Sequence, residues 1–454
     1  MSVRKRRPLP INRRLYSLVM RLAVPFLLLR LLWRSRRHSG YRSQLWHRLG
    51  LYGRHRASRS NERVWIHAVS VGETLAMAPL LELLLADRPD LTVLVTSTTP
   101  TGAEQVEQKF AGRVEWCWAP FDTPGAVRRF LTHWHPRVGA LVETEIWPNL
   151  LTHAAARGVP MILLNARLSE RSASGYGRVA GLTRQTLSHL AAVAAQTESD
   201  ASRLRALGAA EEAVIVTGSL KFALDRSALR QANQQERLQF GAGAFDRPVW
   251  LAASTHPGEE EPVLEVFAQL KAEQPNALLM LAPRHPDRVP GILGMPAVRQ
   301  YQVVCHSAFQ PGVGATHGEG EGAASISLTL EDDVLVIDTL GRLGALTGCA
   351  DAVFVGGSLI PHGGHNPLEA AAWCLPILSG PHTFNFASIY RDLFEANAAV
   401  EVEANTLGTA LLDCLGQQAD TEEVAAMGER AGAYQLAQEG VVERQWAVLA
   451  AHLP

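Results

Sequence analysis

Residues 356–369 read Gly-Gly-Ser-Leu-Ile-Pro-His-Gly-Gly-His-Asn-Pro-Leu-Glu, and they follow an apolar run, residues 351–355, that predicts a buried strand. The stretch then predicts a helix start: Asn366 suits the N-cap, Pro367 the first helical position, and Glu369 a capping role three residues later. A strand, a glycine loop and a helix N-terminus together are typical of an anion site, and we expect a nucleotide phosphate there. A glycine-rich turn with a capping box explains the same residues without a ligand.

The charges of the chain are unevenly distributed along its 454 residues. The formal net charge is −1, from 43 basic and 44 acidic residues, yet residues 1–61 contain sixteen Lys or Arg and no Asp or Glu. A basic arm on an acidic body predicts that only one end of the protein meets an anionic surface. The length allows two domains of ordinary size, each with its own core.

The N-terminal segment combines this positive charge with apolar residues. Residues 15–33 are apolar except where Arg21, Pro25 and Arg30 interrupt them, and the longest uncharged piece is too short to span a bilayer alone. No small-residue cleavage site follows. We therefore expect residues 1–60 to form an uncleaved anchor or an interfacial helix that faces anionic lipid from the cytoplasmic side. Nucleic-acid binding is the alternative, and we do not expect it, because leucines outnumber the aromatic residues that stack on bases.

From residue 63 onward, apolar runs alternate with amphipathic ones, which predicts repeated βα units and a largely parallel, open sheet. The predicted strands are residues 64–69, 91–95, 138–142, 161–164, 191–195 and 213–216 in the first half, and 249–253, 277–281, 302–305, 334–337, 352–355 and 375–378 in the second. A polar run between them, residues 225–247, is the predicted linker. The sequence thus predicts two doubly wound α/β domains, residues 61–224 and 248–454, whose strand ends face a shared cleft.

Acidic and basic residues follow the predicted strands of the first domain. Glu73 suits a general base if its pKa is raised toward neutrality, although a helix-start residue favoured by the dipole is the plainer explanation. Glu143 and Glu145 follow the third strand, and we prefer Glu143 as the cleft residue because it lies nearer the strand end; solvated loop acids are the alternative. Lys221 follows the last strand, where it can reach a phosphate or simply face solvent.

The loops of the second domain offer groups that bind phosphate. Hydroxyls and a glycine lie in residues 253–259, Arg284 follows the second strand, and residues 338–343 pass through a glycine into a helix. Together with the stretch 356–369 they predict a nucleotide mono- or diphosphate ester as the ligand. The sequence has no Asp-x-Asp and no paired C-x-x-C among its five cysteines, so we expect a reducing compartment, no metal site and no cofactor.

These motifs resemble the 3-deoxy-D-manno-octulosonic acid (Kdo) transferases of lipopolysaccharide synthesis. The resemblance covers nearly the whole chain, and its motifs are His67–Thr74, Glu143–Asn149, Gly218–Lys221, Ser254–Glu259, Pro283-Arg284, Asp338–Gly341 and Gly363–Glu369. It implies a GT-B architecture of two Rossmann-like domains, the first for the acceptor and the second for the CMP-sugar. It also implies transfer of Kdo with inversion from CMP-Kdo to a lipid A precursor at the cytoplasmic side of the bacterial inner membrane.

The resemblance also assigns roles to individual residues. It implies that Glu73 is the general base and that Glu143 and Lys221 stabilise the transition state. The CMP contacts that it implies are Pro283, Arg284, Gly341, Arg342, Leu343, Asn366, Pro367, Leu368 and Glu369. One of them, Arg342, departs from the family pattern, in which an acidic residue is expected.

Two other classes of function fit the same sequence. Another sugar-nucleotide enzyme of this architecture, such as a hydrolysing epimerase, would share the loops of the second domain but would not need the N-terminal arm. A membrane-bound scaffold protein would keep the sheets without the chemistry. Loss of transfer in a Glu73→Ala variant would distinguish the transferase from both.

Overall fold

The computed structural model describes residues 11–36, 38–53, 62–224, 226–241, 243–309 and 327–454. These residues form two compact units, each described below by itself. Unit 1 comprises Met1–Ala223 and Gln438–Pro454, and unit 2 comprises Leu224–Ala437. The first ten residues of the expected N-terminal arm lie outside the described residues.

Unit 1 is built on a seven-stranded, wholly parallel sheet with the order β3-β2-β1-β4-β5-β6-β7. The strands are β1 (Arg63–His67), β2 (Thr92–Ser97), β3 (Glu115–Trp118), β4 (Val138–Val142), β5 (Met161–Ala166), β6 (Leu190–Ala195) and β7 (Val214–Val216). The central strands are buried on both faces, which is why their sequences are almost continuously apolar.

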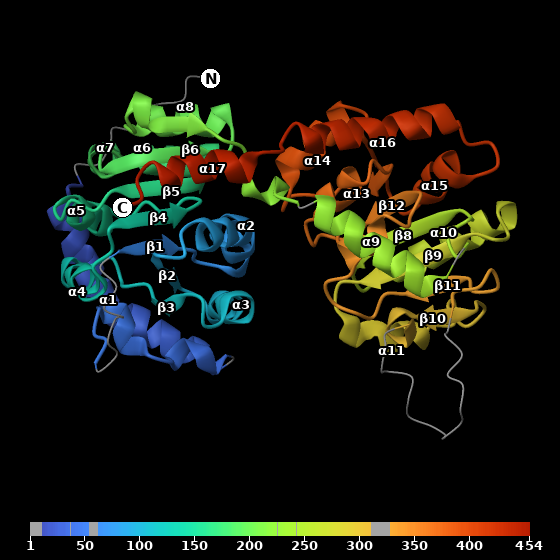
Figure 1. Cartoon of the computed structure of the whole chain (residues 1–454), viewed down its shortest axis with the longest axis horizontal. Helices are drawn as coiled ribbons and strands as arrows, with labels where there is room; N and C mark the ends of the chain where they lie inside the picture. Colours follow the sequence, from blue (N-terminus) through green and yellow to red (C-terminus); the bar gives the residue numbers. More distant parts are fainter. Residues whose placement is uncertain (1–10, 37, 54–61, 225, 242, 310–326) are drawn as a thin grey trace. The chain divides into compact units, whose positions relative to one another are not determined.

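Helices cover both faces of this sheet (Figure 1). One face packs against α4 (Pro124–Trp134), α5 (Pro148–Ala155), α7 (Ala180–Leu187) and α8 (Glu198–Leu207), and the other against α2 (Val71–Asp87), α3 (Pro100–Phe110) and α17 (Val441–Ala450). The remaining elements of unit 1 are α1 (Arg13–Arg34), α6 (Glu170–Gly177) and the 3-10 turns η1 (Ser39–Arg42), η2 (Leu45–Leu49), η3 (Glu211–Ala213) and η4 (Leu220–Phe222).

Unit 2 repeats this plan with seven parallel strands in the order β10-β11-β9-β8-β12-β13-β14. They are β8 (Val249–Thr255), β9 (Leu278–Pro283), β10 (Val303–Cys305), β11 (Val334–Val336), β12 (Ala352–Val355), β13 (Ile377–Ser379) and β14 (Ala399–Glu401). The helices are α9 (Arg226–Phe240), α10 (Glu260–Glu273), α11 (Val289–Leu293), α12 (Leu343–Thr347), α13 (Leu368–Ala372), α14 (Ala387–Glu395), α15 (Leu407–Leu415) and α16 (Thr421–Leu436), with the turns η5 (Pro286–Arg288) and η6 (His306–Phe309). The predicted doubly wound α/β fold is confirmed for both units.

The expected domain boundaries differ from the structure in two places. The run 225–247, expected to be a linker, contains helix α9, which buries Asn233, Glu236 and Phe240 within unit 2. The second domain, expected to extend over 248–454, ends at Ala437, because α17 buries apolar side chains in the core of unit 1. The composition of the sequence alone did not show that α9 packs within unit 2 or that α17 packs on unit 1.

Helix α1 is longer than the uncharged piece of sequence suggested. It continues through Pro25 and the arginines, and by length and composition it is one helix able to cross a membrane among the residues searched. Near its start, Tyr16 Oη donates to Asp122 Oδ2 (2.9 Å) and Ser17 Oγ donates to Asn149 Oδ1 (2.7 Å), while Leu22 and Phe26 are exposed. One side of α1 is therefore held on unit 1, while Leu22 and Phe26 are exposed in the part of the chain that the structure describes.

Candidate functional site

In each unit the order of strands reverses beside its first strand, at β1/β4 in unit 1 and at β8/β12 in unit 2. Crevices outside the carboxyl ends of strands at such switch points are the usual ligand sites of open α/β sheets. Glu73 lies in the first turn of α2, which follows β1, and Glu143 directly follows β4, so the two predicted acids flank the switch point of unit 1. The loops that begin at His256, after β8, and at Gly356, after β12, flank the switch point of unit 2.

Glu73 lies in the first turn of α2, where it also caps the helix. Ser70 is the N-cap, and its Oγ accepts a hydrogen bond from the Glu73 N–H (3.4 Å) and donates one to Glu73 Oε1 (3.2 Å). The Val69 N–H donates to Glu73 Oε2 (2.6 Å). The helix-start role considered for Glu73 is therefore real, and it fixes the direction of the carboxylate.

The environment of Glu73 also changes its acidity. The residue is 9% exposed, and burial raises its pKa from the usual 4.5 to about 7, with a smaller contribution in the same direction from the negative charges of Glu143 and Glu145. The hydrogen bonds from Val69 and Ser70 oppose this rise. A carboxylate with a pKa near neutrality is suited to accept a proton from an alcohol.

Glu143 and Glu145 both lie near Glu73, so the structure brings the three acids of the first unit together. Glu143 has a positive φ of 63°, which costs energy in a non-glycine residue and is typical of functional sites. Glu145 accepts a hydrogen bond from Trp147 Nε1, and its Oε2 lies 3.9 Å from Nε2 of His67. Burial lowers the pKa of His67 to about 4, so this histidine is neutral beside the acid.

Lys221 lies in the turn η4, just after β7, and its N–H donates to Ser219 Oγ (3.4 Å). The turn packs against α2, the helix that begins beside Glu73, and against α17. The predicted base and the predicted lysine are thus on neighbouring elements of unit 1.

The glycine loop of unit 2 does not offer all its N–H groups to a ligand. The carboxylate of Glu259, which is 0% exposed, accepts hydrogen bonds from four backbone N–H groups: His256 (3.0 Å), Gly357 (2.7 Å), Ser358 (3.0 Å) and Leu359 (3.0 Å). Three N–H groups of the predicted anion site therefore already bind an anion that is part of the protein, and a nucleotide phosphate would have to meet other groups of the stretch 356–369. Sequence analysis noted the segment 253–259 for its hydroxyls and missed this acid.

The helix after the loop starts later than expected. Pro367, and not Asn366, is the N-cap of α13, although Asn366 Oδ1 does accept a hydrogen bond from the Leu368 N–H (3.2 Å). The helix has only 5 residues. Its dipole is accordingly small, and a phosphate bound near it would depend on side chains as well.

Several of the predicted CMP contacts do come together in unit 2. Burial raises the pKa of Glu369 and the nearby charge of Arg284 lowers it, so Arg284, which follows Pro283 at the end of β9, lies in the neighbourhood of this carboxylate. A Cβ at Gly344 would lie 3.6 Å from Glu369 Oε2, which places the carboxylate against the start of α12, next to Leu343. The loops after β9, β11 and β12 therefore converge.

Arg342 is held by a residue from the expected linker. Its Nη1 lies 3.3 Å from Oε1 of the buried Glu236 on α9, and Glu236 Oε2 lies 2.9 Å from Nε2 of His306. His306 Nδ1 and Thr339 Oγ1 form a further hydrogen bond (2.7 Å). Helix α9 thus supports the loop 338–343, and no sequence motif pointed to this role.

Histidines gather beside Arg284. His256 Nε2 lies 2.8 Å from His365 Nε2, and the ring of His256 stacks on that of His362 with centroids 4.3 Å apart. Burial lowers the pKa of His365 to about 4, and Arg284 adds to the effect. Within the described ranges, no group of three or more His, Cys, Asp or Glu is arranged to hold a metal ion.

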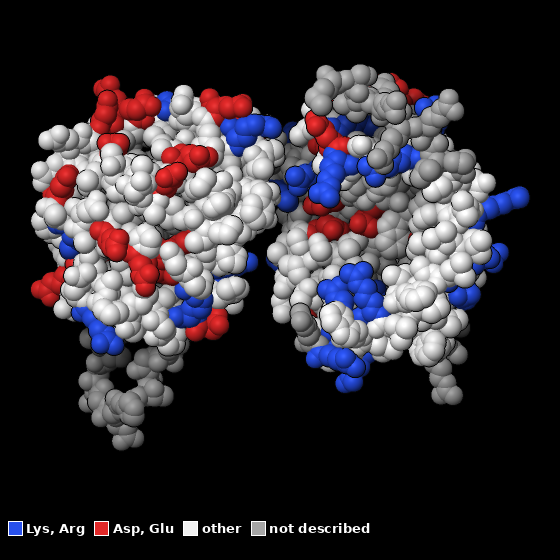
Figure 2. Space-filling view, turned by 180° about the vertical axis from the view of Figure 1, so that it is seen from behind, with Lys and Arg blue, Asp and Glu red and all other residues white. Residues whose placement is uncertain are grey.

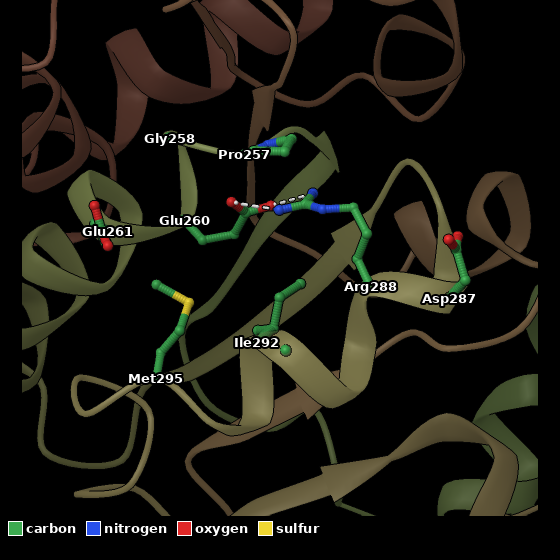
Figure 3. Close-up of a pocket in the computed structure, with 9 residues that line it drawn as sticks. Pro257, Gly258, Glu260, Glu261, Asp287, Arg288, Ile292 and Met295 are labelled. Carbon is green, nitrogen blue, oxygen red and sulfur yellow. Dashed lines mark hydrogen bonds and ion pairs between the residues drawn. The ribbon is translucent and has the colours of Figure 1, made fainter.

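A pocket of about 420 Å³ lies between the loop after β8 and helix α11. Figure 3 shows Arg288 reaching toward Glu260, with Ile292 and Met295 on the other side of the hollow. The two charged groups form a paired contact, with distances of 2.8 and 3.1 Å between Arg288 nitrogens and Glu260 oxygens. None of the predicted site residues lines this pocket.

A family model and two relatives of this chain carry the same description. A sequence model described as 3-deoxy-D-manno-octulosonic-acid transferase (kdotransferase) matches residues 43–224. A 3-deoxy-D-manno-octulosonic acid transferase from Haemophilus influenzae is 35% identical over 86% of this chain and 87% of its own length. One from Bordetella pertussis is 39% identical over 95% of this chain and 97% of its own length.

Among solved structures, a UDP-GlcNAc 2-epimerase from Neisseria meningitidis bound to UDP-GlcNAc is similar with a TM-score of 0.54. The similarity covers 86% of this chain and all of that one, at 14% identity, and it concerns the fold alone. The expected GT-B type of fold, with two Rossmann-like units, is confirmed.

Proposed function

Because this chain belongs to the 3-deoxy-D-manno-octulosonic acid transferase family, we propose that it transfers Kdo from CMP-Kdo to a lipid A precursor in lipopolysaccharide synthesis. In this proposal the transfer is a single displacement that inverts the anomeric centre and releases CMP. The observation that carries the mechanism is Glu73, a mostly buried carboxylate at the switch point of unit 1 whose pKa is raised to about 7.

In the proposed step one bond forms at the anomeric carbon and one bond breaks there. A hydroxyl oxygen of the acceptor forms a bond to the anomeric carbon of Kdo while the bond from that carbon to the CMP phosphate oxygen breaks. The hydroxyl proton passes to Glu73, and the electron pair of the broken bond stays on the phosphate. A phosphate monoester is a good leaving group, so the step needs positive charge at the phosphate more than it needs a strong acid.

We propose that Lys221 and Arg284 supply this positive charge, and that Lys221 and Glu143 stabilise the transition state, as the family resemblance implies. CMP is held by Pro283, Arg284 and the loops that carry Gly341–Leu343 and Asn366–Glu369, with Glu369 on the ribose. Convergence of Arg284, Glu369 and the start of α12 supports this part of the proposal. These protein charges make a metal ion unnecessary in the proposed mechanism.

We further propose that the protein works at the cytoplasmic side of the bacterial inner membrane, bound through α1. The helix exposes Leu22 (65%) and Phe26 (74%), and its charged residues are all arginines. Figure 2 shows further patches of Lys and Arg on the face that it draws. Both features suit an anionic lipid surface, where the acceptor of the proposed reaction lies.

The test of the reaction uses the purified full-length protein with CMP-Kdo and a tetra-acylated lipid A precursor. We expect a Kdo-bearing lipid and free CMP in proportion to it. Release of free Kdo without a Kdo-bearing lipid would indicate a hydrolase, and CMP binding without turnover would indicate a scaffold. Either result would refute the proposed function.

Substitutions on the exposed side of α1 test the proposed membrane binding. Replacing Leu22 and Phe26 by Glu keeps the Tyr16 and Ser17 hydrogen bonds, and we expect the protein to move from the membrane to the soluble fraction. Leu238→Glu is the matched control, because Leu238 on α9 is equally exposed (81%) but is not part of α1. Full membrane retention of the double variant would show that another surface binds the lipid.

A further inference from the structure

The last helix of the chain, α17, lies beside β5 and β6 in unit 1 (Figure 1) and packs on the turn that leads to Lys221. Gly218, which starts this turn, has a φ of 91°, and a Cβ there would lie 2.7 Å from Cγ2 of Val441 on α17. Any side chain at position 218 would be strained and would push the helix away. Glycine at position 218 therefore allows residues 217–221 to pack directly against α17.

Two polar side chains of α17 hold the main chain of this turn. Gln445 is 0% exposed, and its Nε2 donates to the carbonyl of Gly218 (3.1 Å) while its Oε1 accepts from the N–H of Asn165 (2.9 Å). Arg444 Nε donates to the carbonyl of Thr217 (2.9 Å). A glutamine buried for packing alone would be costly, whereas this one uses both ends of its amide.

Asn165, at the end of β5, completes the support from the other side. It is 0% exposed and has a φ of 51°, at a shift in the register between β5 and β6. Its Oδ1 accepts from the N–H of Leu220 (3.0 Å), and its carbonyl accepts from Gln196 Nε2 (2.9 Å). Asparagine tolerates a positive φ better than most residues, and here that conformation aims its side chain at the turn.

The anchor points therefore lie directly before the lysine in the chain. Gly218 is held from α17, Leu220 is held from β5, and Lys221 is the next residue. A lysine side chain has many rotamers, so the place of its ammonium group depends first on a fixed main chain. A displacement of about 1 Å at a group that acts on the reacting atoms costs up to ~100-fold in rate.

We propose that Asn165 and Gln445 are positioning residues, which fix the turn 218–221 so that the Lys221 ammonium is held where the transfer reaction needs it. This inference rests on the proposed function, in which Lys221 stabilises the transition state. It extends the site to a helix more than 200 residues away in sequence. Neither residue touches the substrates in this proposal.

The test measures kcat and KM of the full-length protein in the Kdo transfer assay. Gln445→Met keeps the shape of the side chain and removes both hydrogen bonds, and we expect kcat to fall 10- to 100-fold while KM for CMP-Kdo changes less than 3-fold. Gln435→Met is the matched control: Gln435 is also 0% exposed, and its amide makes no hydrogen bond within the described structure. We expect this control to keep the wild-type kcat.

A second comparison separates positioning from a general loss of structure. In a Lys221→Ala background, Gln445→Met should reduce kcat less than 2-fold further, because the group that it positions is already absent. The inference would be overturned if the fall of kcat in the double variant equalled the product of the falls in the two single variants. It would also be overturned if Gln445→Met kept the wild-type kcat. Transfer at the wild-type rate by Lys221→Ala alone would overturn it as well.

Asn165→Gly provides a milder variant if Gln445→Met fails to fold. Glycine accepts the positive φ, and the substitution removes the buried amide with its hydrogen bond from the Leu220 N–H while both hydrogen bonds of Gln445 can remain, so we expect a smaller fall of kcat, about 10-fold, with a circular dichroism spectrum like that of the wild type. An unchanged kcat in Asn165→Gly would refute the role of Asn165. Absence of any Kdo-bearing lipid with the wild-type protein would instead refute the proposed function, so the two failures are distinguishable.

Discussion

Glu73 in unit 1 and Glu259 in unit 2 occupy equivalent places, since each follows the first strand of its sheet and lies at the start of the next helix. Their surroundings differ. Glu73 accepts hydrogen bonds from one backbone N–H and one hydroxyl, and Glu259 accepts four from backbone N–H groups. The glycine loop after β12 causes this difference, because it folds over Glu259 and supplies three of the four donors.

The comparison shows that two carboxylates at equivalent positions of the fold can have different roles. A carboxylate whose oxygens are all engaged by the main chain acts as part of the scaffold. A carboxylate with fewer donors in a buried site keeps a raised affinity for a proton, which is the property of a base.

The largest effect is expected for Glu73→Ala. Loss of the base should lower kcat for Kdo transfer by 10³-fold or more, on the order of the upper range for general base catalysis, while CMP binding measured by calorimetry stays nearly unchanged. Glu73→Gln separates the two roles of the residue, because its amide oxygen can still accept from Val69. If Glu73→Gln transfers at the wild-type rate, Glu73 only caps the helix.

Glu259→Ala should mainly lower the stability of the protein and affect the rate of transfer less. The substitution leaves four buried N–H groups without their acceptor, so we expect the free energy of unfolding to fall by about 3 kcal/mol in urea titrations. Glu261→Ala is the control, because Glu261 is close in sequence and exposed. An equally stable Glu259→Ala variant would mean that the glycine loop does not depend on this carboxylate.

The pH dependence of the transfer reaction should follow the protonation of Glu73. A general base must be deprotonated, so kcat/KM should rise with pH and level off above a pKa of about 7, the value for Glu73. The same raised pKa means that the folded protein holds the proton more tightly than the unfolded chain. The stability that Glu73 contributes is then fully present below about 4.5 and is lost as the pH rises through 7. Unfolding of Glu73→Gln should lack this component, and a pH–rate profile flat from 5 to 8 would contradict the assignment.

The smallest effect is expected for Glu145→Gln. Removal of its negative charge should lower the pKa of Glu73, and the midpoint of the pH–rate profile should move down by about 0.3 pH units. Glu170→Gln removes an equal charge from a side chain that is 89% exposed, and it should leave the midpoint in place. A midpoint that moves up in Glu145→Gln would be inconsistent with the three-acid arrangement.

Much of the fold follows from local sequence patterns. Central strands such as β1, β4 and β12 are buried on both faces, so their apolar runs are unmistakable. The two strands missed, β3 and β14, lie at sheet edges and are short: residues 115–118 begin with an acid, and residues 399–401 end with one. Edge strands need less burial, and so they carry a weaker pattern.

Candidate residues could be located from the sequence where they lie close to the end of a strand. Glu143 and Arg284 directly follow β4 and β9, and Glu73 lies in the first turn of the helix after β1. Support from distant segments was not predictable. Glu236 reaches Arg342 from a run that looked like a linker, and Gln445 reaches Gly218 from the far end of the chain, so no local spacing reveals either contact.

The return of α17 to unit 1 has a consequence for how the protein is made. On the ribosome, unit 1 emerges first but lacks its last helix until the 214 residues of Leu224–Ala437 have followed. At typical rates of synthesis this delay is about 10 to 40 s, during which the surface that α17 later covers is open to chaperones or to misassembly. Unit 2 is contiguous in sequence and has no such delay. The half of the protein that is translated second is therefore the first to be complete.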